Sequence, residues 1–79
     1  MLRPKRNTLV VTFHTTAEAM AMEVLCREHA IAGRLFPVPR ALSSDCGIAW
    51  SMDPADRPQL EALLQKGETA YDEICELLL

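Results

Sequence analysis

Two prolines stand in the strand-like run RLFPVP, residues Arg34–Pro39. Because proline has no backbone N–H, it cannot complete hydrogen-bond ladders on both sides of a strand and belongs at the edge of a sheet. The run is therefore expected to form an edge strand. A second apolar run, CGIAWSM (Cys46–Met52), follows after only RALSSD, so a hairpin is the simplest connection between the two runs.

The first third of the chain changes from a strand-like to a helical pattern. NTLVVTF (Asn7–Phe13) is rich in β-branched and aromatic residues and predicts a central strand. The stretch that follows predicts a helix of about four turns, with Thr15 or Thr16 as its N-cap and Gly33 at its C-cap. Three apolar residues of this helix should face the sheet: Ala21, Met22 and Leu25.

The last third of the chain changes from a helical to a strand-like pattern. A second helix is expected to start from Asp56, with Gln59 completing a capping box, and to end at Gly67. Its buried stripe should consist of Leu60, Leu63 and Leu64. The final strand should lie within YDEICELLL (Tyr71–Leu79), with Ile74–Leu78 as its surest part.

The predicted order of elements is β-α-β-β-α-β, with short connections. It matches the α+β ferredoxin-like arrangement, a four-stranded antiparallel sheet with both helices on one face and with the first and third strands central. We expect residues 1–79 to form a single domain, in which residues 1–6 are a basic N-terminal tail.

Composition excludes several classes of protein. The formal net charge of −3 gives no general attraction to nucleic acid, and the single tryptophan provides no stacking platform for bases. No apolar run approaches the roughly 20 residues of a membrane span. We therefore expect a cytoplasmic protein with no nucleic-acid or membrane partner, and a homodimer through the proline-bearing edge or the outer sheet face is an open alternative.

The three cysteines must each be judged separately. Cys26, Cys46 and Cys75 show neither CxxC spacing nor a clustered histidine pair, so we expect free thiols with no metal and no cofactor. Cys26 lies on the helix flank and Cys75 inside the last strand, and both should be buried. Cys46 stands at the end of the hairpin loop and is the candidate reactive residue.

Topology predicts where Cys46 should lie. The hairpin loop should meet the N-terminus of the first helix, where unpaired N–H groups and the helix dipole stabilise a thiolate. The residues expected to stabilise the thiolate or a bound anion are Thr15, Thr16, Arg40, Ser43, Ser44 and Gly47. His14 could accept a proton from the thiol, whereas Asp45 should oppose its ionisation. A simple structural cysteine is the alternative.

PVPRALSSDCG, residues 37–47, resembles a segment of the selenium/sulfur carrier-like family, once described as a domain of unknown function. The resemblance extends from about Thr8 to Leu79. It implies a small cysteine protein linked to selenium or sulfur handling, a family sometimes fused to TusA-like sulfur-carrier domains. By motif match, Cys46 is the expected carrier residue, framed by Arg40, Ser43 and Gly47, and Asp45 departs from the usual small or neutral residue.

Two functions therefore stand open at this point. The first is a carrier that holds a persulfide or selenopersulfide on Cys46, taken from a cysteine desulfurase-like donor and passed to an acceptor such as a TusA-like protein. It would be a carrier and not a complete enzyme. The second is a non-catalytic module that binds a partner or an anion, in which the sulfur is incidental. Redox sensing through Cys46 and a resolving thiol is a weaker third.

Overall fold

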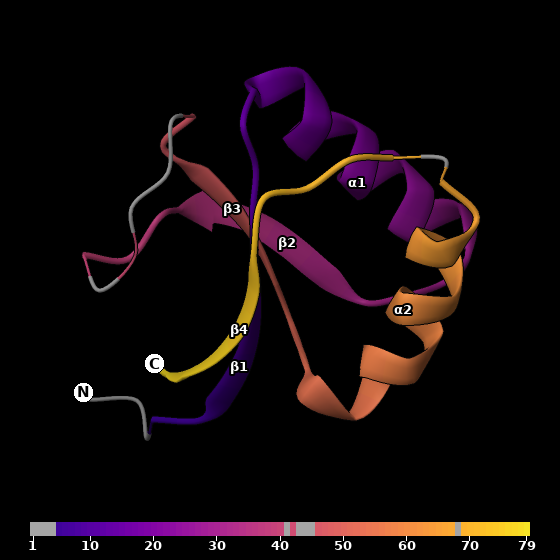
Figure 1. Cartoon of the computed structure of the whole chain (residues 1–79). Helices are drawn as coiled ribbons and strands as arrows, with labels where there is room; N and C mark the ends of the chain where they lie inside the picture. The colour runs from indigo at the N-terminus through magenta and orange to yellow at the C-terminus, as the bar shows by residue number, and fades with distance from the viewer. Residues whose placement is uncertain (1–4, 41, 43–45, 68) are drawn as a thin grey trace.

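A computed structural model describes residues 5–40, 42, 46–67 and 69–79. Its four strands form one antiparallel sheet in the order β2-β3-β1-β4 (Figure 1). The strands are β1 (Asn7–Thr12), β2 (Gly33–Pro37), β3 (Ile48–Met52) and β4 (Ile74–Leu78). The helices are α1 (Thr16–Glu28) and α2 (Arg57–Gln65), and a short 3-10 helix, η1 (Pro54–Asp56), precedes α2. The predicted α+β ferredoxin-like fold is confirmed.

The strands take the predicted places in the sheet. β2 lies at one edge and contains Pro37, and β2 pairs with β3 as a hairpin. β1 and β3 are central, as expected. The strand bounds differ slightly from those predicted, because Phe13, Val38, Pro39, Cys46 and Gly47 lie just outside the ladders.

The start of α1 is confirmed, but its predicted end at Gly33 is wrong. The N-cap is Thr15, whose hydroxyl accepts a hydrogen bond from Glu18 N at 3.2 Å. The helix ends with His29 as C-cap, and Ala30 takes the left-handed conformation, with φ 58°. Gly33 opens β2 instead, where a Cβ atom would collide with the Trp50 ring and the Ser51 carbonyl oxygen.

The predicted start of α2 at Asp56 is confirmed, but its predicted capping box is wrong. Asp56 is the N-cap but makes no capping hydrogen bond through its side chain, so the expected capping box with Gln59 is not formed. Asp53 caps η1 instead, by accepting a hydrogen bond from Ala55 N at 2.9 Å. Gly67, at φ 72°, follows the end of the helix as expected.

The core lies between the sheet and both helices, which cover the same face (Figure 1). The sheet contributes Leu9, Val11, Trp50 and Met52, and the helices contribute Ala19, Met22, Leu25, Cys26, Leu60 and Leu63. Leu64 packs against this cluster but is only partly buried. Ala21, which was expected to face the sheet, is exposed, and Ala19 is buried in its place.

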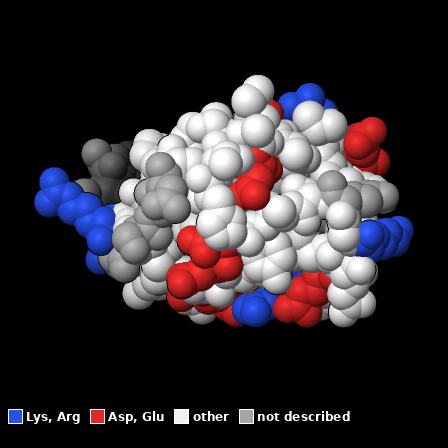
Figure 2. Space-filling model, turned by 45° about the horizontal axis from the view of Figure 1, so that its top comes forward, with Lys and Arg blue, Asp and Glu red and all other residues white. Residues whose placement is uncertain are grey.

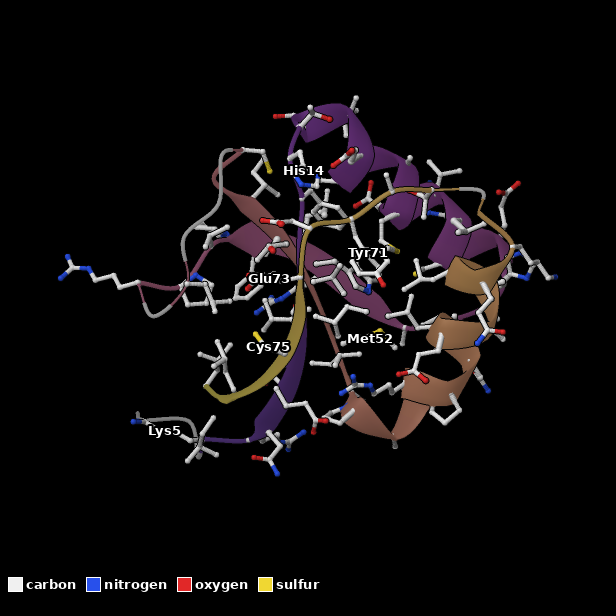
Figure 3. All side chains as sticks on the ribbon, in the orientation of Figure 1. Lys5, His14, Met52, Tyr71, Glu73 and Cys75 are labelled. Carbon is white, nitrogen blue, oxygen red and sulfur yellow. The ribbon has the colours of Figure 1, made fainter. Side chains whose placement is uncertain are left out.

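Among the described residues, no helix covers the opposite face of the sheet (Figure 1). Side chains alternate along each strand, so Val10 and its neighbour Cys75 point to this face. Figure 3 shows Cys75 and Glu73 on this side of β4, and Tyr71 on the helix side. Val10 is fully buried, whereas Cys75 is only partly buried, which corrects the expectation for Cys75. Within the described residues, no helix is long and apolar enough to cross a membrane.

Candidate functional site

Cys46 lies two residues before β3, at the end of the sheet where β1 finishes and α1 begins. The last pair of the β1–β3 ladder is Thr12 with Ala49. The turn before β3 and the start of α1 therefore lie at the same end of the sheet. The predicted approach of Cys46 to the N-cap of α1 stays a prediction.

The Cys46 side chain is partly buried and packs against the hydrophobic core. Its thiol donates a hydrogen bond to the carbonyl oxygen of Ile48 at 3.0 Å. The sulfur also accepts a hydrogen bond from the Ile48 N–H at 3.4 Å. Both groups belong to the main chain of the first residue of β3, so the position of the sulfur is set by the strand itself.

Gly47 gives the chain the conformation that these contacts require. Its φ is 73°, in the left-handed region, and an added Cβ would meet no atom within 4 Å. Its carbonyl oxygen accepts a hydrogen bond from Val38 N at 3.1 Å, which closes the base of the hairpin loop. Gly47 therefore allows the left-handed turn that follows Cys46.

The remaining predicted residues of the loop are only partly described. Arg40 is exposed at a turn. Leu42 N donates to the carbonyl oxygen of Pro39 at 3.0 Å. Ser43, Ser44 and Asp45 lie outside the described residues, so their predicted roles remain predictions.

The opening turn of α1 is partly occupied by groups of its own chain. The Thr15 hydroxyl accepts a hydrogen bond from the Glu18 N–H. The Glu18 carboxylate accepts a hydrogen bond from the backbone N–H of His14 at 2.7 Å. Thr15 and Thr16 are both exposed. A carboxylate therefore already lies at the helix N-terminus, where the sequence interpretation placed a thiolate or an anion.

His14 lies between two carboxylates. Its Nδ1 is 3.4 Å from Glu18 Oε1, and its Nε2 is 3.5 Å from Asp72 Oδ1. Asp72 is anchored to the end of β1, because its N–H donates to the carbonyl oxygen of Thr12 at 2.7 Å. The imidazole therefore joins the start of α1 to the segment that enters β4.

The electrostatic character of this end is acidic. Figure 2 turns this end toward the viewer and shows Asp and Glu side chains near the middle of the view, with Lys and Arg toward its margins. Glu18, Asp72 and Glu73 all lie within a few residues of this end of β1 or β4. Within the described residues, no group of three or more His, Cys, Asp or Glu side chains could hold a metal ion.

The other two thiols are less suited to act as nucleophiles at neutral pH. Burial raises the pKa of Cys26 to about 11 from an ordinary value of 9.0. Partial burial, and secondarily the charge of Glu73, raise the pKa of the Cys75 thiol. Because the thiolate is the reactive form, a raised pKa lowers the reactivity of both thiols at neutral pH.

Sequence reasoning missed three participants in this site. Ile48 acts through its backbone, which no residue-type pattern can reveal. Glu18 could have been found as the third residue of the helix after its cap, where an acidic side chain reaches back to an N–H. Asp72 is brought in by the β1–β4 register and has no local signal.

Comparison with known proteins agrees with the resemblance read from the motif. A family model described as "Putative Se/S carrier protein-like" matches residues 8–76. No curated protein and no solved structure matched the chain. Because the match covers most of the sequence, the chain belongs to this selenium/sulfur carrier-like family.

Proposed function

We propose that the protein carries sulfur or selenium as a persulfide or selenopersulfide on Cys46. The observation that carries the proposal is the contrast among the three thiols. Cys46 lies at the end of the sheet on an open turn, whereas the pKa values of Cys26 and Cys75 are raised by burial. Family membership supports the same role.

The transfer balances without an external oxidant or reductant. The Cys46 thiolate attacks the outer sulfur of a persulfide on a donor protein, such as a cysteine desulfurase. A new S–S bond forms on Cys46, the S–S bond of the donor breaks, and the donor leaves as a thiolate. In delivery, an acceptor thiolate attacks the outer sulfur, and Cys46 is the leaving thiolate. Selenium would follow the same steps as the outer atom.

The described contacts suit a sulfur that is both nucleophile and leaving group. The Ile48 N–H, 3.4 Å from the sulfur, can stabilise the Cys46 thiolate when it forms. The Ile48 carbonyl oxygen holds the neutral thiol at 3.0 Å. Gly47 provides the left-handed turn next to the sulfur, and its own Cα has no neighbour that a Cβ would meet beyond the adjoining residues.

The other site residues have supporting roles in this proposal. Arg40, Ser43 and Ser44 offer a positive charge and hydrogen-bond donors to a charged outer sulfur. Thr15 and Thr16 mark the positive end of α1, and His14 is the proposed proton acceptor. The protein acts as a carrier between separate donor and acceptor proteins in the cytoplasm, and a TusA-like protein is the proposed acceptor.

Intact mass after incubation with a cysteine desulfurase and cysteine tests the proposal. We expect a sulfur-sized gain that a reductant removes and that peptide mapping assigns to Cys46. Cys75→Ser should still gain sulfur, whereas Cys46→Ser should not. A gain located on Cys26 or Cys75, or no gain at all, would overturn the proposal. Partner binding that Cys46→Ser leaves intact, without any sulfur gain, would favour the non-catalytic binding module.

A further inference from the structure

The two edges of the sheet differ in how they are protected. β2 carries Pro37, which cannot donate to an added strand. β4 forms the other edge and contains no proline in its sequence ICELL. Within the described chain, no strand pairs with its outer side. An unpaired edge of this kind can serve as a template for another strand, and β4 has no proline that would prevent such pairing.

The register shows which backbone groups of β4 are available. Arg6 and Leu79 exchange both N–H···O bonds, at 2.9 and 3.0 Å, and Thr12 N donates to Glu73 O at 2.9 Å. Such pairs alternate along an antiparallel ladder. The backbone N–H and C=O groups therefore alternate in direction. They face β1 at Glu73, Cys75, Leu77 and Leu79, and they face the open edge at Ile74, Glu76 and Leu78.

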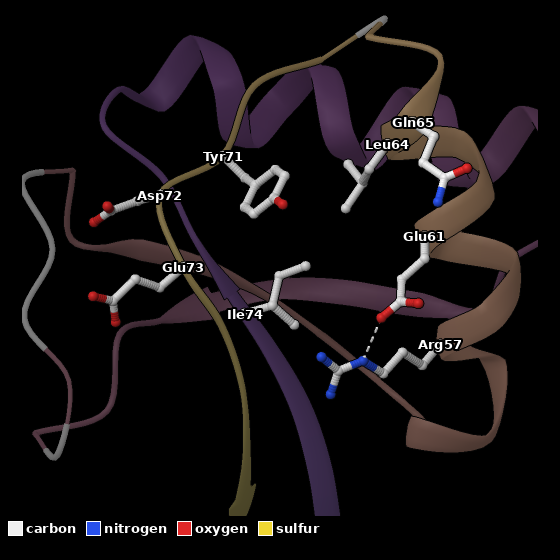
Figure 4. A pocket seen from close by; sticks show the side chains of 8 residues that line it. All are labelled: Arg57, Glu61, Leu64, Gln65, Tyr71, Asp72, Glu73 and Ile74. Carbon is white, nitrogen blue, oxygen red and sulfur yellow. Dashed lines mark hydrogen bonds and ion pairs between the residues drawn. The ribbon is translucent and has the colours of Figure 1, made fainter.

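A groove runs beside this edge, between β4 and α2 (Figure 4). Tyr71, Leu64 and Ile74 point into it. Several apolar side chains along β4 remain exposed: Tyr71 by 40%, Leu78 by 61% and Leu79 by 41%. A strand added to the edge would cover part of this apolar surface, which adds to the hydrogen bonds it would form.

The charges around the groove are mainly acidic. Arg57 donates to Glu61 at 2.7 Å and to Glu76 at 3.0 Å, so its charge is already matched. Asp72 and Glu73 also line the groove, and Glu73 points away from the helices (Figure 4). A second copy of this chain would bring the same negative charges to the edge, whereas a basic strand would be attracted.

We propose that an extended segment of a partner protein, with alternating basic and apolar residues, pairs with the open edge of β4. Its backbone bonds to Ile74, Glu76 and Leu78. Its apolar side chains face the groove lined by Leu64 and Tyr71, and its basic side chains face the Glu73 side, because side chains alternate along a strand. This surface does not include Cys46, although it shares Asp72 with the candidate functional site, and it does not depend on the carrier function.

A synthetic peptide of alternating lysine and valine, seven residues long with blocked ends, is the probe. We expect amide shifts in an NMR titration to centre on β4 and the groove, and binding to weaken as salt is raised. An otherwise identical peptide with glutamate in place of lysine should not bind. Equal binding of both peptides, or shifts centred elsewhere, would overturn the proposal.

Leu78→Pro removes an outward N–H without removing a bond to β1, so it should block the edge while the protein folds. Affinity for the lysine peptide should fall by about tenfold. Leu78→Thr is the matched control, since it loses the same apolar side chain but keeps the N–H, and it should bind far more tightly than Leu78→Pro. Equal affinities of the two variants would contradict strand addition. Sedimentation that shows dimers abolished by Leu78→Pro, with no peptide binding, would assign the edge to a second copy.

Discussion

At the scale of single residues, the three thiols lie in different surroundings. Cys26 is fully enclosed in the core, Cys75 lies on the uncovered face of the sheet, and Cys46 occupies the turn before β3. The same side chain therefore has a structural role in one place and a proposed chemical role in another. Burial separates Cys26 from the other two cysteines, whereas Cys46 and Cys75 are both partly buried and differ in the element that carries them.

The raised pKa of Cys26 predicts a pH dependence of stability. The folded value is about 11 and the ordinary value 9.0, so the folded state favours the neutral thiol. The stabilisation is complete below pH 9 and is lost as the pH rises toward 11, by about 2 kcal/mol. Urea unfolding of the wild type and Cys26→Ala across this range should show a steeper loss for the wild type. Parallel curves would contradict the prediction.

Residue identity predicted only part of the site. The motif around Cys46 and Gly47 was readable from the sequence, because a left-handed turn favours glycine. The expected cap at Gly33 was wrong because a different constraint, the Trp50 ring against its Cα, explains that glycine. A glycine needed for a left-handed turn and a glycine needed for close packing look the same in the sequence. They are told apart only by knowing which side chains pack against each.

At the scale of elements, the start of α1 combines structural and proposed functional roles. Thr15 caps the helix, and Glu18 returns to the N–H of His14. Threonine is a favoured capping residue, and the N-cap was expected at Thr15 or Thr16, so this end was predicted correctly. The end of the helix was not, since Ala30 takes a conformation for which its residue type gives no signal.

Thr15→Ala should lower the free energy of unfolding by about 1 kcal/mol, because Glu18 N loses its capping acceptor. Denaturant unfolding measures the change. Thr15→Ser should retain most of the stability, since its hydroxyl can accept the same bond. Thr16→Ala, at an exposed neighbouring position, should change stability by only about 0.5 kcal/mol or less. An equal loss at both threonines would mean that the cap contributes little.

At the scale of the whole molecule, the sequence predicted the topology because few arrangements satisfy its pattern. Prolines placed β2 at an edge, and the order of elements then left β1 and β3 in the centre. The groove beside β4 could not be predicted in the same way. It depends on how far α2 stands from the sheet and on the pair of Arg57 with Glu76, which joins residues distant in sequence.

Hydrogen exchange should reproduce this arrangement. The amides of Val10 and Val11, in the strand between two neighbours, should exchange most slowly and only through global unfolding. Along β4, the amides of Cys75 and Leu77 should be protected, whereas those of Ile74, Glu76 and Leu78 should exchange quickly. Residue-resolved NMR exchange measures this alternation. Uniform protection along β4 would show that the open edge is covered.

The two hydrogen bonds between Cys46 and Ile48 use main-chain atoms of Ile48. Exchanging the isoleucine for another β-branched residue would thus keep the anchorage of the sulfur unchanged. The position of the Ile48 main chain depends on the pairing of β3 with β2, in which Pro37 lies opposite Ile48. Weakening this last pair of the β2–β3 ladder would displace the thiol, although no atom of the cysteine itself is changed.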